Sequence, residues 1–200
     1  MEKKALLELL DAVRSGATSV EEAAHALEVL PYTELGYATV DHQRQLMKGF
    51  PEVIFGPGKT VDQMVGILEE LRHGGGNVLV TRVAPKKAEA VIEQVPGLKH
   101  HEVAQALTLE QRPWEDLGRG PLAVVCAGTS DLPVAYEAAL TARIMGNEVD
   151  LIADVGVAGI HRILSKRERL ERCTAVVVVA GMEGALASVV GGLVSRPVIG

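Results

Sequence analysis

The stretch Val124–Pro133 constrains the fold of this chain most, because it reads as a strand, a tight turn and the start of a helix. Its first residues are apolar and β-branched, as in a buried parallel strand. Gly128 is expected to give the turn its conformational freedom, and Ser130 and Asp131 are good N-cap residues. Backbone N–H groups and the positive end of the helix dipole then meet at one point, which favours an anion, most often a phosphate.

The rest of the second half alternates strands with helices. Such alternation predicts parallel crossover units and an α/β fold, a parallel sheet with helices on both faces. The strand near residue 180 runs into a glycine-rich turn that carries one acid, Glu183, and then into a helix of small residues. We expect strands at 122–126, 148–153, 174–180 and 197–200, and helices at 132–145, 159–170 and 184–194.

Composition excludes several classes of protein. Hydrophobic residues make up 48% of the 200 residues but aromatic ones only 3%, so the expected core is aliphatic. The formal net charge is −6 and no basic cluster is interleaved with aromatics, which argues against nucleic-acid binding. The apolar run after Thr174 is interrupted by Glu183 and glycines, which argues against a membrane span. Cys126 and Cys173 read as two free thiols, and with no visible signal peptide they predict a cytoplasmic protein.

The first half reads as two smaller units, so we expect a smaller α+β N-terminal domain before the parallel sheet. Helices over 2–14 and from Ser19 to about Leu30 give a helical unit at 1–34. A small α/β region follows at 35–118, and the main domain occupies 119–200. Between 35 and 118 we expect strands at 37–40, 52–55, 77–82 and 98–103, helices at 61–73 and 85–94, and a polar linker at 105–120.

Gly58-Lys59-Thr60 suggests a P-loop, but that motif needs a glycine where this chain has Val53. We therefore interpret Thr60 as the N-cap of the helix over 61–73.

Ligands of open parallel sheets bind beyond the carboxyl ends of the strands, and three such ends carry chemistry. The first has Ala127, Gly128, Thr129, Ser130 and Asp131, the second has His161 and Arg162, and the third has Gly181, Met182 and Glu183. One crevice would then hold anion-binding donors, a His-Arg pair and two carboxylates. Such a site suits a phosphorylated small molecule and proton transfer on it, with Asp131, His161 and Glu183 as the catalytic candidates.

Each candidate also has a purely structural interpretation. Ser130 and Asp131 suit capping, His161 suits packing, and Arg162 suits a surface ion pair. Glu183 stands alone in an apolar, glycine-rich turn, where burial would raise its pKa. The spacing of His, Asp and Glu residues supports no metal triad, so Glu183 is the single candidate metal ligand.

Several of these motifs together resemble the aminoimidazole ribonucleotide carboxylase/mutase (PurE-like) family of purine biosynthesis, and more closely its relative LarB. The motifs run from about residue 35 to the end of the chain. They are Phe50-Pro-Glu-Val-Ile-Phe-Gly56, Gly58-Lys-Thr60, Ala127-Gly-Thr-Ser-Asp-Leu-Pro-Val-Ala135, Met145-Gly-Asn147, Asp154-Val-Gly-Val-Ala-Gly159 with Ile-His-Arg162, and Ala180-Gly-Met-Glu-Gly184.

The resemblance implies a three-layer, flavodoxin-like domain and a carboxylase–hydrolase of nicotinic acid adenine dinucleotide. That enzyme adds CO2 to the pyridinium ring and splits the pyrophosphate. Its products are AMP and pyridinium-3,5-biscarboxylic acid mononucleotide, used for the nickel-pincer cofactor. The resemblance also implies CO2 or bicarbonate as co-substrate, help from Mg2+, no organic cofactor, and a homo-octamer. In the family a cysteine adds to the pyridinium ring, which is covalent catalysis by a thiolate.

Three positions depart from the family. The purine enzyme has a serine where this chain has Gly128, and it has small residues where this chain has Glu183. Both departures favour the LarB interpretation over the alternative, a carboxyaminoimidazole ribonucleotide mutase. At Met47 we expect a basic residue. A non-catalytic nucleotide-binding module on the same fold is the alternative from a different class.

The chain stops at Val198–Gly200, inside an expected buried strand. In the resembled family another helix and the segment with the nucleophilic cysteine follow, and neither Cys126 nor Cys173 replaces that residue. From the sequence we therefore expect the main domain to be truncated. We also expect these 200 residues to bind nucleotide poorly, or without completing carboxylation, and a longer form to be the active one.

Overall fold

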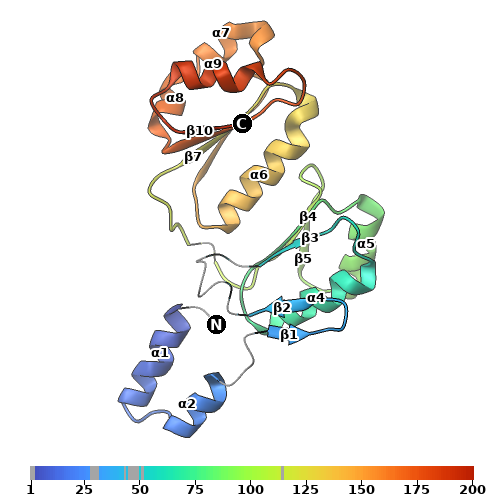
Figure 1. Ribbon diagram of the computed structural model, residues 1–200, viewed down its shortest axis with the longest axis vertical. Helices are drawn as coiled ribbons and strands as arrows, with labels where there is room; N and C mark the ends of the chain where they lie inside the picture. Colours follow the sequence, from blue (N-terminus) through green and yellow to red (C-terminus); the bar gives the residue numbers. More distant parts are fainter. Residues whose placement is uncertain (1–2, 28–31, 43, 45–49, 51, 114) are drawn as a thin grey trace.

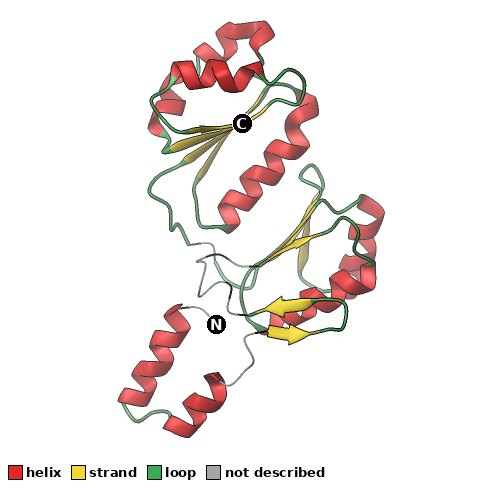
Figure 2. Ribbon diagram, in the orientation of Figure 1, coloured by secondary structure: helices red, strands yellow, loops and turns green. Residues whose placement is uncertain are grey.

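The computed structural model describes the chain except for residues 1–2, 28–31, 43, 45–49, 51 and 114. Among the described residues it has two four-stranded sheets and a two-stranded hairpin, with helices around them (Figures 1 and 2). One sheet is entirely parallel and lies between helices, so the predicted α/β class is confirmed. Met47, where the sequence departs from the family, lies outside the described residues.

The chain begins with two helices, α1 (Lys3–Arg14) and α2 (Val20–Leu27). The predicted capping box is confirmed, since the Glu22 N–H donates to Ser19 Oγ at 3.0 Å and the Ser19 N–H to Glu22 Oε2 at 2.9 Å. The predicted end of this helix near Leu30 lies outside the described residues. The helical pair stands beside the rest of the molecule in Figure 1.

The first four-stranded sheet has the order β3-β4-β6-β5; β3 pairs with β4 in parallel, whereas the pairings β4–β6 and β6–β5 are antiparallel. Helices α4 and α5 cover one face through Met64, Leu68 and Val91. The elements of this part are β1 (Tyr32–Glu34), β2 (Thr39–Asp41), β3 (Val53–Phe55), α4 (Val61–His73), β4 (Val78–Thr81), α5 (Pro85–Gln94), β5 (Leu98–His101) and β6 (Ala106–Leu109).

Both predicted helices of this part are confirmed, and so is the cap of α4. The Gln63 N–H donates to Thr60 Oγ1 at 3.2 Å, and the Thr60 N–H donates to Gln63 Oε1 at 3.0 Å. Thr60 therefore begins a helix by satisfying its first amide groups, as the sequence predicted.

The predicted linker over 105–120 is wrong at its start, because strand β6 lies inside the sheet between β4 and β5 and is fully buried. Two features explain why the sequence did not predict strand β6. The turn before β6 contains no glycine or proline, since Gln105 itself adopts a left-handed φ of 49°. The one polar residue of the strand, Thr108, hydrogen-bonds its hydroxyl to His101 Nε2 at 2.9 Å, so its burial costs little.

The second sheet is parallel throughout, in the order β10-β9-β7-β8. The strands match the prediction to within two residues. The elements of this part are β7 (Leu122–Cys126), α6 (Leu132–Ile144), β8 (Val149–Ile152), α7 (Ile160–Leu164), α8 (Arg167–Arg172), β9 (Ala175–Val179), α9 (Ala185–Leu193) and β10 (Val198–Ile199).

Alternate residues of β7 face opposite layers. Val124 and Cys126 contact α6, whereas Ala123 and Val125 belong to the core under α7, α8 and α9. This alternation follows from the two-residue period of a strand and yields the predicted three layers (Figure 2).

The helix predicted over 159–170 is instead two short helices, α7 and α8, joined at Ser165 and Lys166. The Ser165 hydroxyl donates to the Arg162 carbonyl oxygen at 2.8 Å, a local bond that competes with continued helix.

The two sheets meet through α6. Leu140 and Ile144 on this helix form one apolar cluster with Leu79 of β4 and Ala106 of β6. Helix α6 is therefore shared, with one side on the parallel sheet and the other on the mixed sheet. The limits of independently folding domains at residues 34 and 118 stay a prediction.

Candidate nucleotide site

Three loops follow the carboxyl ends of neighbouring parallel strands. They are residues 127–131 after β7, 153–159 after β8 and 180–184 after β9. Because β7 lies between β9 and β8, its loop is flanked by the other two. This is the edge at which parallel α/β sheets bind ligands.

The β7 and β8 loops are joined by backbone hydrogen bonds. The Gly156 N–H donates to the Ala127 carbonyl oxygen at 2.9 Å, and the Val155 N–H to the Cys126 carbonyl oxygen at 3.2 Å. A Cβ on Gly156 would lie 2.9 Å from the Ala127 oxygen, closer than real Cβ contacts. The close approach of these loops therefore needs a glycine at 156.

Asp131 joins the β7 loop to the β9 loop. Its Oδ2 accepts from the Gly128 N–H at 2.8 Å and its Oδ1 from the Gly181 N–H at 3.0 Å. The sequence predicted an N-cap here, but this side chain makes no capping bond to α6. Its two oxygens instead hold backbone N–H groups of the β7 and β9 loops. Asp131 therefore positions these two loops at the carboxyl edge of the parallel sheet.

The predicted phosphate turn is one turn of 3-10 helix, Thr129–Asp131, leading into α6. Thr129 and Ser130 are exposed, and their backbone N–H groups make no hydrogen bond to any described residue. These donors, at the positive end of a 13-residue helix, have the arrangement that binds phosphate.

The conformational reason given for Gly128 is wrong. Its φ of −136° and ψ of 177° are extended values that any residue adopts. A Cβ there would lie 3.8 Å from Asp131 Oδ2, an ordinary contact. The glycine leaves space beside the turn, and a serine would fit there.

His161 and Arg162 both follow β8 but have different surroundings. Arg162 Nη1 lies 2.8 Å from Asp154 Oδ2, and its guanidinium occupies the space that a Cβ on Gly159 would take. Asp154 has a left-handed φ of 57°, an uncommon conformation for a residue with a side chain. His161 is exposed, and its imidazole forms no hydrogen bond or ion pair with a described residue, so the ring can meet a ligand.

Glu183 and Met182 stand in solvent after β9. Met182 is 93% exposed, and Glu183 is exposed as well, so the expected burial of this carboxylate within the chain is wrong. Gly184 takes a left-handed φ of 70° at the start of α9 and turns the chain there. Glu183 forms no hydrogen bond or ion pair with a described residue, so its carboxylate is available to a ligand.

Only one carboxylate of the three loops is available to coordinate Mg2+. Asp131 is occupied by backbone N–H groups and Asp154 by Arg162, which leaves Glu183. The described residues contain no group of three or more His, Cys, Asp or Glu side chains arranged for a metal. Mg2+ at substrate phosphates commonly takes one or two carboxylates, so Glu183 fits such a role.

Both cysteines are buried, and burial raises the pKa of the Cys126 and Cys173 thiols. The Cys173 thiol also donates to the Arg169 carbonyl oxygen at 3.3 Å. Nucleophilic cysteines are thiolates in partly exposed, electropositive surroundings, which neither position offers.

We therefore predict that native protein resists iodoacetamide at pH 7.5, whereas urea-unfolded protein takes two labels by intact mass. Native labelling should increase only as the pH approaches the raised thiol pKa values. Fast single labelling of Cys126 at pH 7.5 would show instead that this thiol is an accessible nucleophile.

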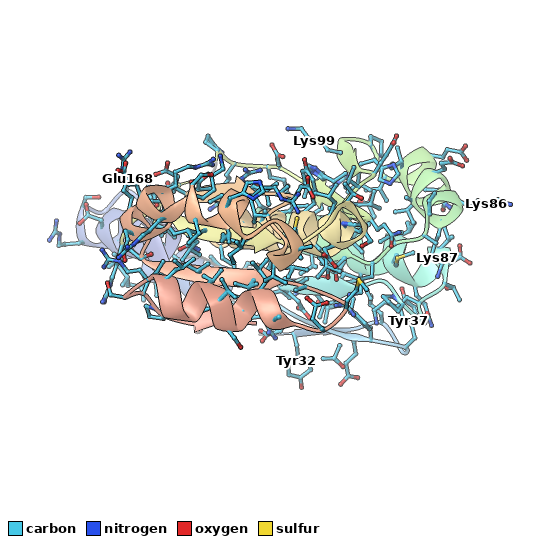
Figure 3. The ribbon with its side chains drawn as sticks, turned by 90° about the horizontal axis from the view of Figure 1, so that it is seen from above. Tyr32, Tyr37, Lys86, Lys87, Lys99 and Glu168 are labelled. Carbon is cyan, nitrogen blue, oxygen red and sulfur yellow. The ribbon has the colours of Figure 1, made fainter. Side chains whose placement is uncertain are left out.

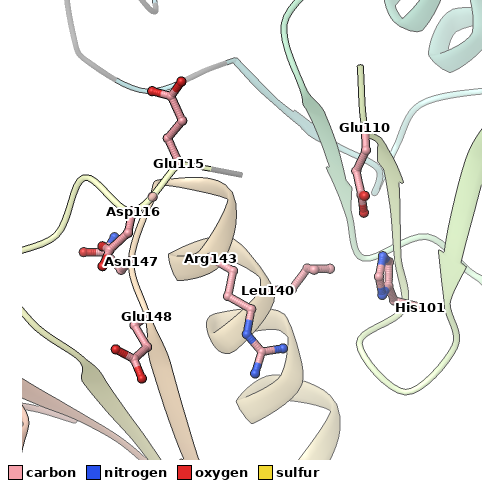
Figure 4. A pocket seen from close by; sticks show the side chains of 9 residues that line it. His101, Glu110, Glu115, Asp116, Leu140, Arg143, Asn147 and Glu148 are labelled. Carbon is pink, nitrogen blue, oxygen red and sulfur yellow. The ribbon is translucent and has the colours of Figure 1, made fainter. Parts of the chain in front are cut away.

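A cavity of about 500 Å3 lies elsewhere, between the C-terminal end of α6 and the mixed sheet (Figure 4). Its polar side chains include Arg143, His101 and several carboxylates. Burial lowers the pKa of His101, and nearby Glu110 opposes that change. The cavity is lined from the end of α6, the turn before β8, the mixed sheet and the segment at 110–116, so it is separate from the three loops.

His42 contacts two polar side chains of the mixed-sheet part of the molecule. Its Nε2 lies 2.9 Å from Thr33 Oγ1 and 3.0 Å from Glu70 Oε1. This places His42 in a structural network away from the three loops.

Sequence reasoning missed Asp154 and Gly156 as individual site residues. The available signal was a carboxylate directly after a strand followed by a glycine two residues later. It did find Asp131 but not its partner, because the Gly181 amide lies 50 residues along the chain.

Among the described residues, no helix has both the length and the apolar character needed to cross a bilayer.

Comparison with known proteins identifies the family. Residues 32–112 match the model of the LarB/PurE-like N-terminal domain. An uncharacterized protein of Methanocaldococcus jannaschii is 35% identical over 207 aligned residues, which cover 98% of this chain and 80% of that protein. The first match covers the mixed sheet, and the second extends over the three loops as well. The chain belongs to the LarB/PurE-like family.

Proposed function

We propose that this protein acts on nicotinic acid adenine dinucleotide as a LarB-type carboxylase–hydrolase. The observation that carries the proposal is the turn at Thr129–Asp131, which presents free N–H groups and is fixed to the β9 loop by Asp131. A preorganised anion site at the carboxyl edge suits a nucleotide phosphate. The resemblance of the motifs to LarB indicates which nucleotide this is, nicotinic acid adenine dinucleotide.

Each loop would contribute one function. The β7 loop, from Ala127 to Asp131, would hold a phosphate through backbone N–H groups, with Arg162 adding positive charge from the β8 loop. The β9 loop, through Gly181 and Met182, would line the other side. Mg2+, when bound, would neutralise phosphate charge, and Glu183 is the side chain available to hold it or to move a proton.

His161 would serve as a second proton donor or acceptor, since it is exposed beside the same edge. The buried thiols Cys126 and Cys173 would take no part in the covalent step that the family carries out on the ring. We therefore propose that the three loops bind and position the nucleotide and support cleavage of its pyrophosphate, which releases AMP.

Two alternatives to the LarB-type function can be tested, a purine mutase and a nucleotide-binding module. The His161–Arg162 pair and the phosphate turn also resemble the purine mutase, although Gly128 and Glu183 depart from it. A nucleotide-binding module without turnover would use the same turn.

One assay separates these functions. The protein is incubated with nicotinic acid adenine dinucleotide, labelled bicarbonate and Mg2+, and AMP and carboxylated pyridinium are measured by chromatography with mass detection. We expect AMP binding by calorimetry, and AMP release as the activity of the LarB type. Turnover of aminoimidazole ribonucleotide instead would identify the purine reaction. Tight AMP binding with no turnover of either substrate would favour the module.

We further propose a cytoplasmic homo-oligomer, with the octamer that the family suggests as the expected size. Helix α9 offers small residues for close packing. A monomer by light scattering would contradict assembly.

A further inference from the structure

A dinucleotide substrate has two nucleoside halves, and the three loops surround only one phosphate turn. This inference rests on the proposed function and asks where the second half binds. A groove of about 410 Å3 runs along α6, and Val134 in the first turn of that helix lines it. Its volume is within the range of small-molecule sites, and its beginning lies one helical turn from the phosphate turn.

The far wall of the groove is Arg82, which directly follows β4. Its Nε donates to both carboxylate oxygens of Glu137 on α6, at 3.2 and 3.3 Å. Glu137 is well covered, with 19% of its side chain exposed, so the ion pair fixes the guanidinium across the groove. The terminal nitrogens of Arg82 make no hydrogen bond to a described residue, so they remain available as donors.

Two further features preorganise Arg82. Its φ is 54°, in the left-handed region that residues with side chains rarely adopt. Its guanidinium carbon lies 5.6 Å from the centre of the Phe55 ring. Gly56 makes this close packing possible, because a Cβ there would lie 2.7 Å from the Thr81 carbonyl oxygen and 3.2 Å from that of Arg82.

The chemistry of this wall fits a nucleoside. Arg82 contributes its planar guanidinium to the groove, and Phe55, which is 52% exposed, lies beside that guanidinium but is not among the residues that line the groove. Bases stack on aromatic rings and on guanidinium planes. Val134 and Ala138 add an apolar floor, and Glu137 offers an acceptor for an exocyclic amine or a ribose hydroxyl.

We propose that the groove between α6 and the end of β4 binds the adenosine half of the dinucleotide, with the base stacked on the guanidinium of Arg82. The pyrophosphate then lies at the turn Thr129–Asp131, and the pyridinium half lies over the β8 and β9 loops. The mixed sheet thereby becomes part of the substrate site.

The test compares two ligands by calorimetry, AMP and nicotinic acid mononucleotide, which lacks adenosine. Arg82→Ala should weaken AMP binding by about tenfold or more, while changing mononucleotide binding less than about twofold. Val134→Trp, which fills the groove, should do the same. Phe55→Ala removes only the ring beside Arg82, so it should weaken AMP binding in the same direction but by less. Lys86→Ala removes an exposed cation at the outer end of the mixed-sheet part and serves as the matched control (Figure 3).

Glu137→Gln separates ligand contact from positioning of α6. If Arg82 contacts adenosine, this variant should retain AMP binding better than Arg82→Ala. Equal losses for both ligands in both variants would overturn the subsite and make the ion pair a support for α6. Unchanged AMP affinity in Arg82→Ala and Val134→Trp would also overturn it. Failure of the wild-type protein to bind either nucleotide would instead contradict the proposed function.

Discussion

Asp131→Ala is expected to weaken AMP binding at least about tenfold and to lower the free energy of unfolding by about 2 kcal/mol. The substitution leaves the amides of Gly128 and Gly181 without their acceptor. The phosphate turn then loses its connection to the β9 loop, and the N–H groups that meet the anion are no longer held in place. Calorimetry with AMP measures the first effect and urea unfolding measures the second.

Two variants control this prediction. Asp131→Asn keeps one oxygen acceptor and should lose less of both quantities. Asp116→Ala removes a comparable bond, from the Gly118 N–H at 3.0 Å, at a position that lines the separate 500 Å3 cavity. It should therefore leave AMP binding unchanged. If Asp131→Ala loses stability but binds AMP normally, Asp131 is structural only.

Glu183→Gln is expected to reduce the rate of AMP release from nicotinic acid adenine dinucleotide by about 100-fold, the usual effect of losing one acid–base group. The side chain is exposed and forms no hydrogen bond or ion pair with described residues, so folding should be unaffected. The variant should also lose any gain in dinucleotide affinity that Mg2+ gives to the wild-type protein. Calorimetry with and without Mg2+ provides this second measurement.

Glu168→Gln on α8 is the matched control, because its side chain is 92% exposed and lies at the other end of the molecule from Lys86 and Lys87 (Figure 3). It should retain both turnover and the Mg2+ effect. Full activity of Glu183→Gln would remove this residue from the mechanism.

Local patterns explain most of the fold that the sequence predicted. Thr60 with Gln63 begins α4, and the apolar run at 122–126 is β7, because capping and burial depend on neighbouring residues. Strand β6 was missed because its turn uses a left-handed glutamine rather than a glycine. The break between α7 and α8 was missed because it depends on a single serine hydroxyl.

The candidate site was predictable in its position but not in its contacts. Parallel strands place three loops at one edge, and the sequence identified the residues of each loop. It named Asp131 and Glu183 as site residues, with helix capping as the structural alternative for Asp131 and burial as the reason to single out Glu183; the structure shows no capping bond from Asp131 to α6 and an exposed Glu183. The partners of Asp131 and the exposure of Glu183 depend on parts of the chain that are distant in sequence but close in space. No local sequence pattern specifies these contacts.

The most direct test of the nucleotide site is the response of individual backbone amides to AMP. In an NMR titration of labelled protein, the amides of Gly128, Thr129, Ser130 and Gly181 should shift most and saturate together. Residues that line only the 500 Å3 cavity, such as His101 and Glu115, should stay unchanged. Shifts confined to that cavity, with none at Thr129 and Ser130, would contradict the site at the carboxyl edge of the parallel sheet.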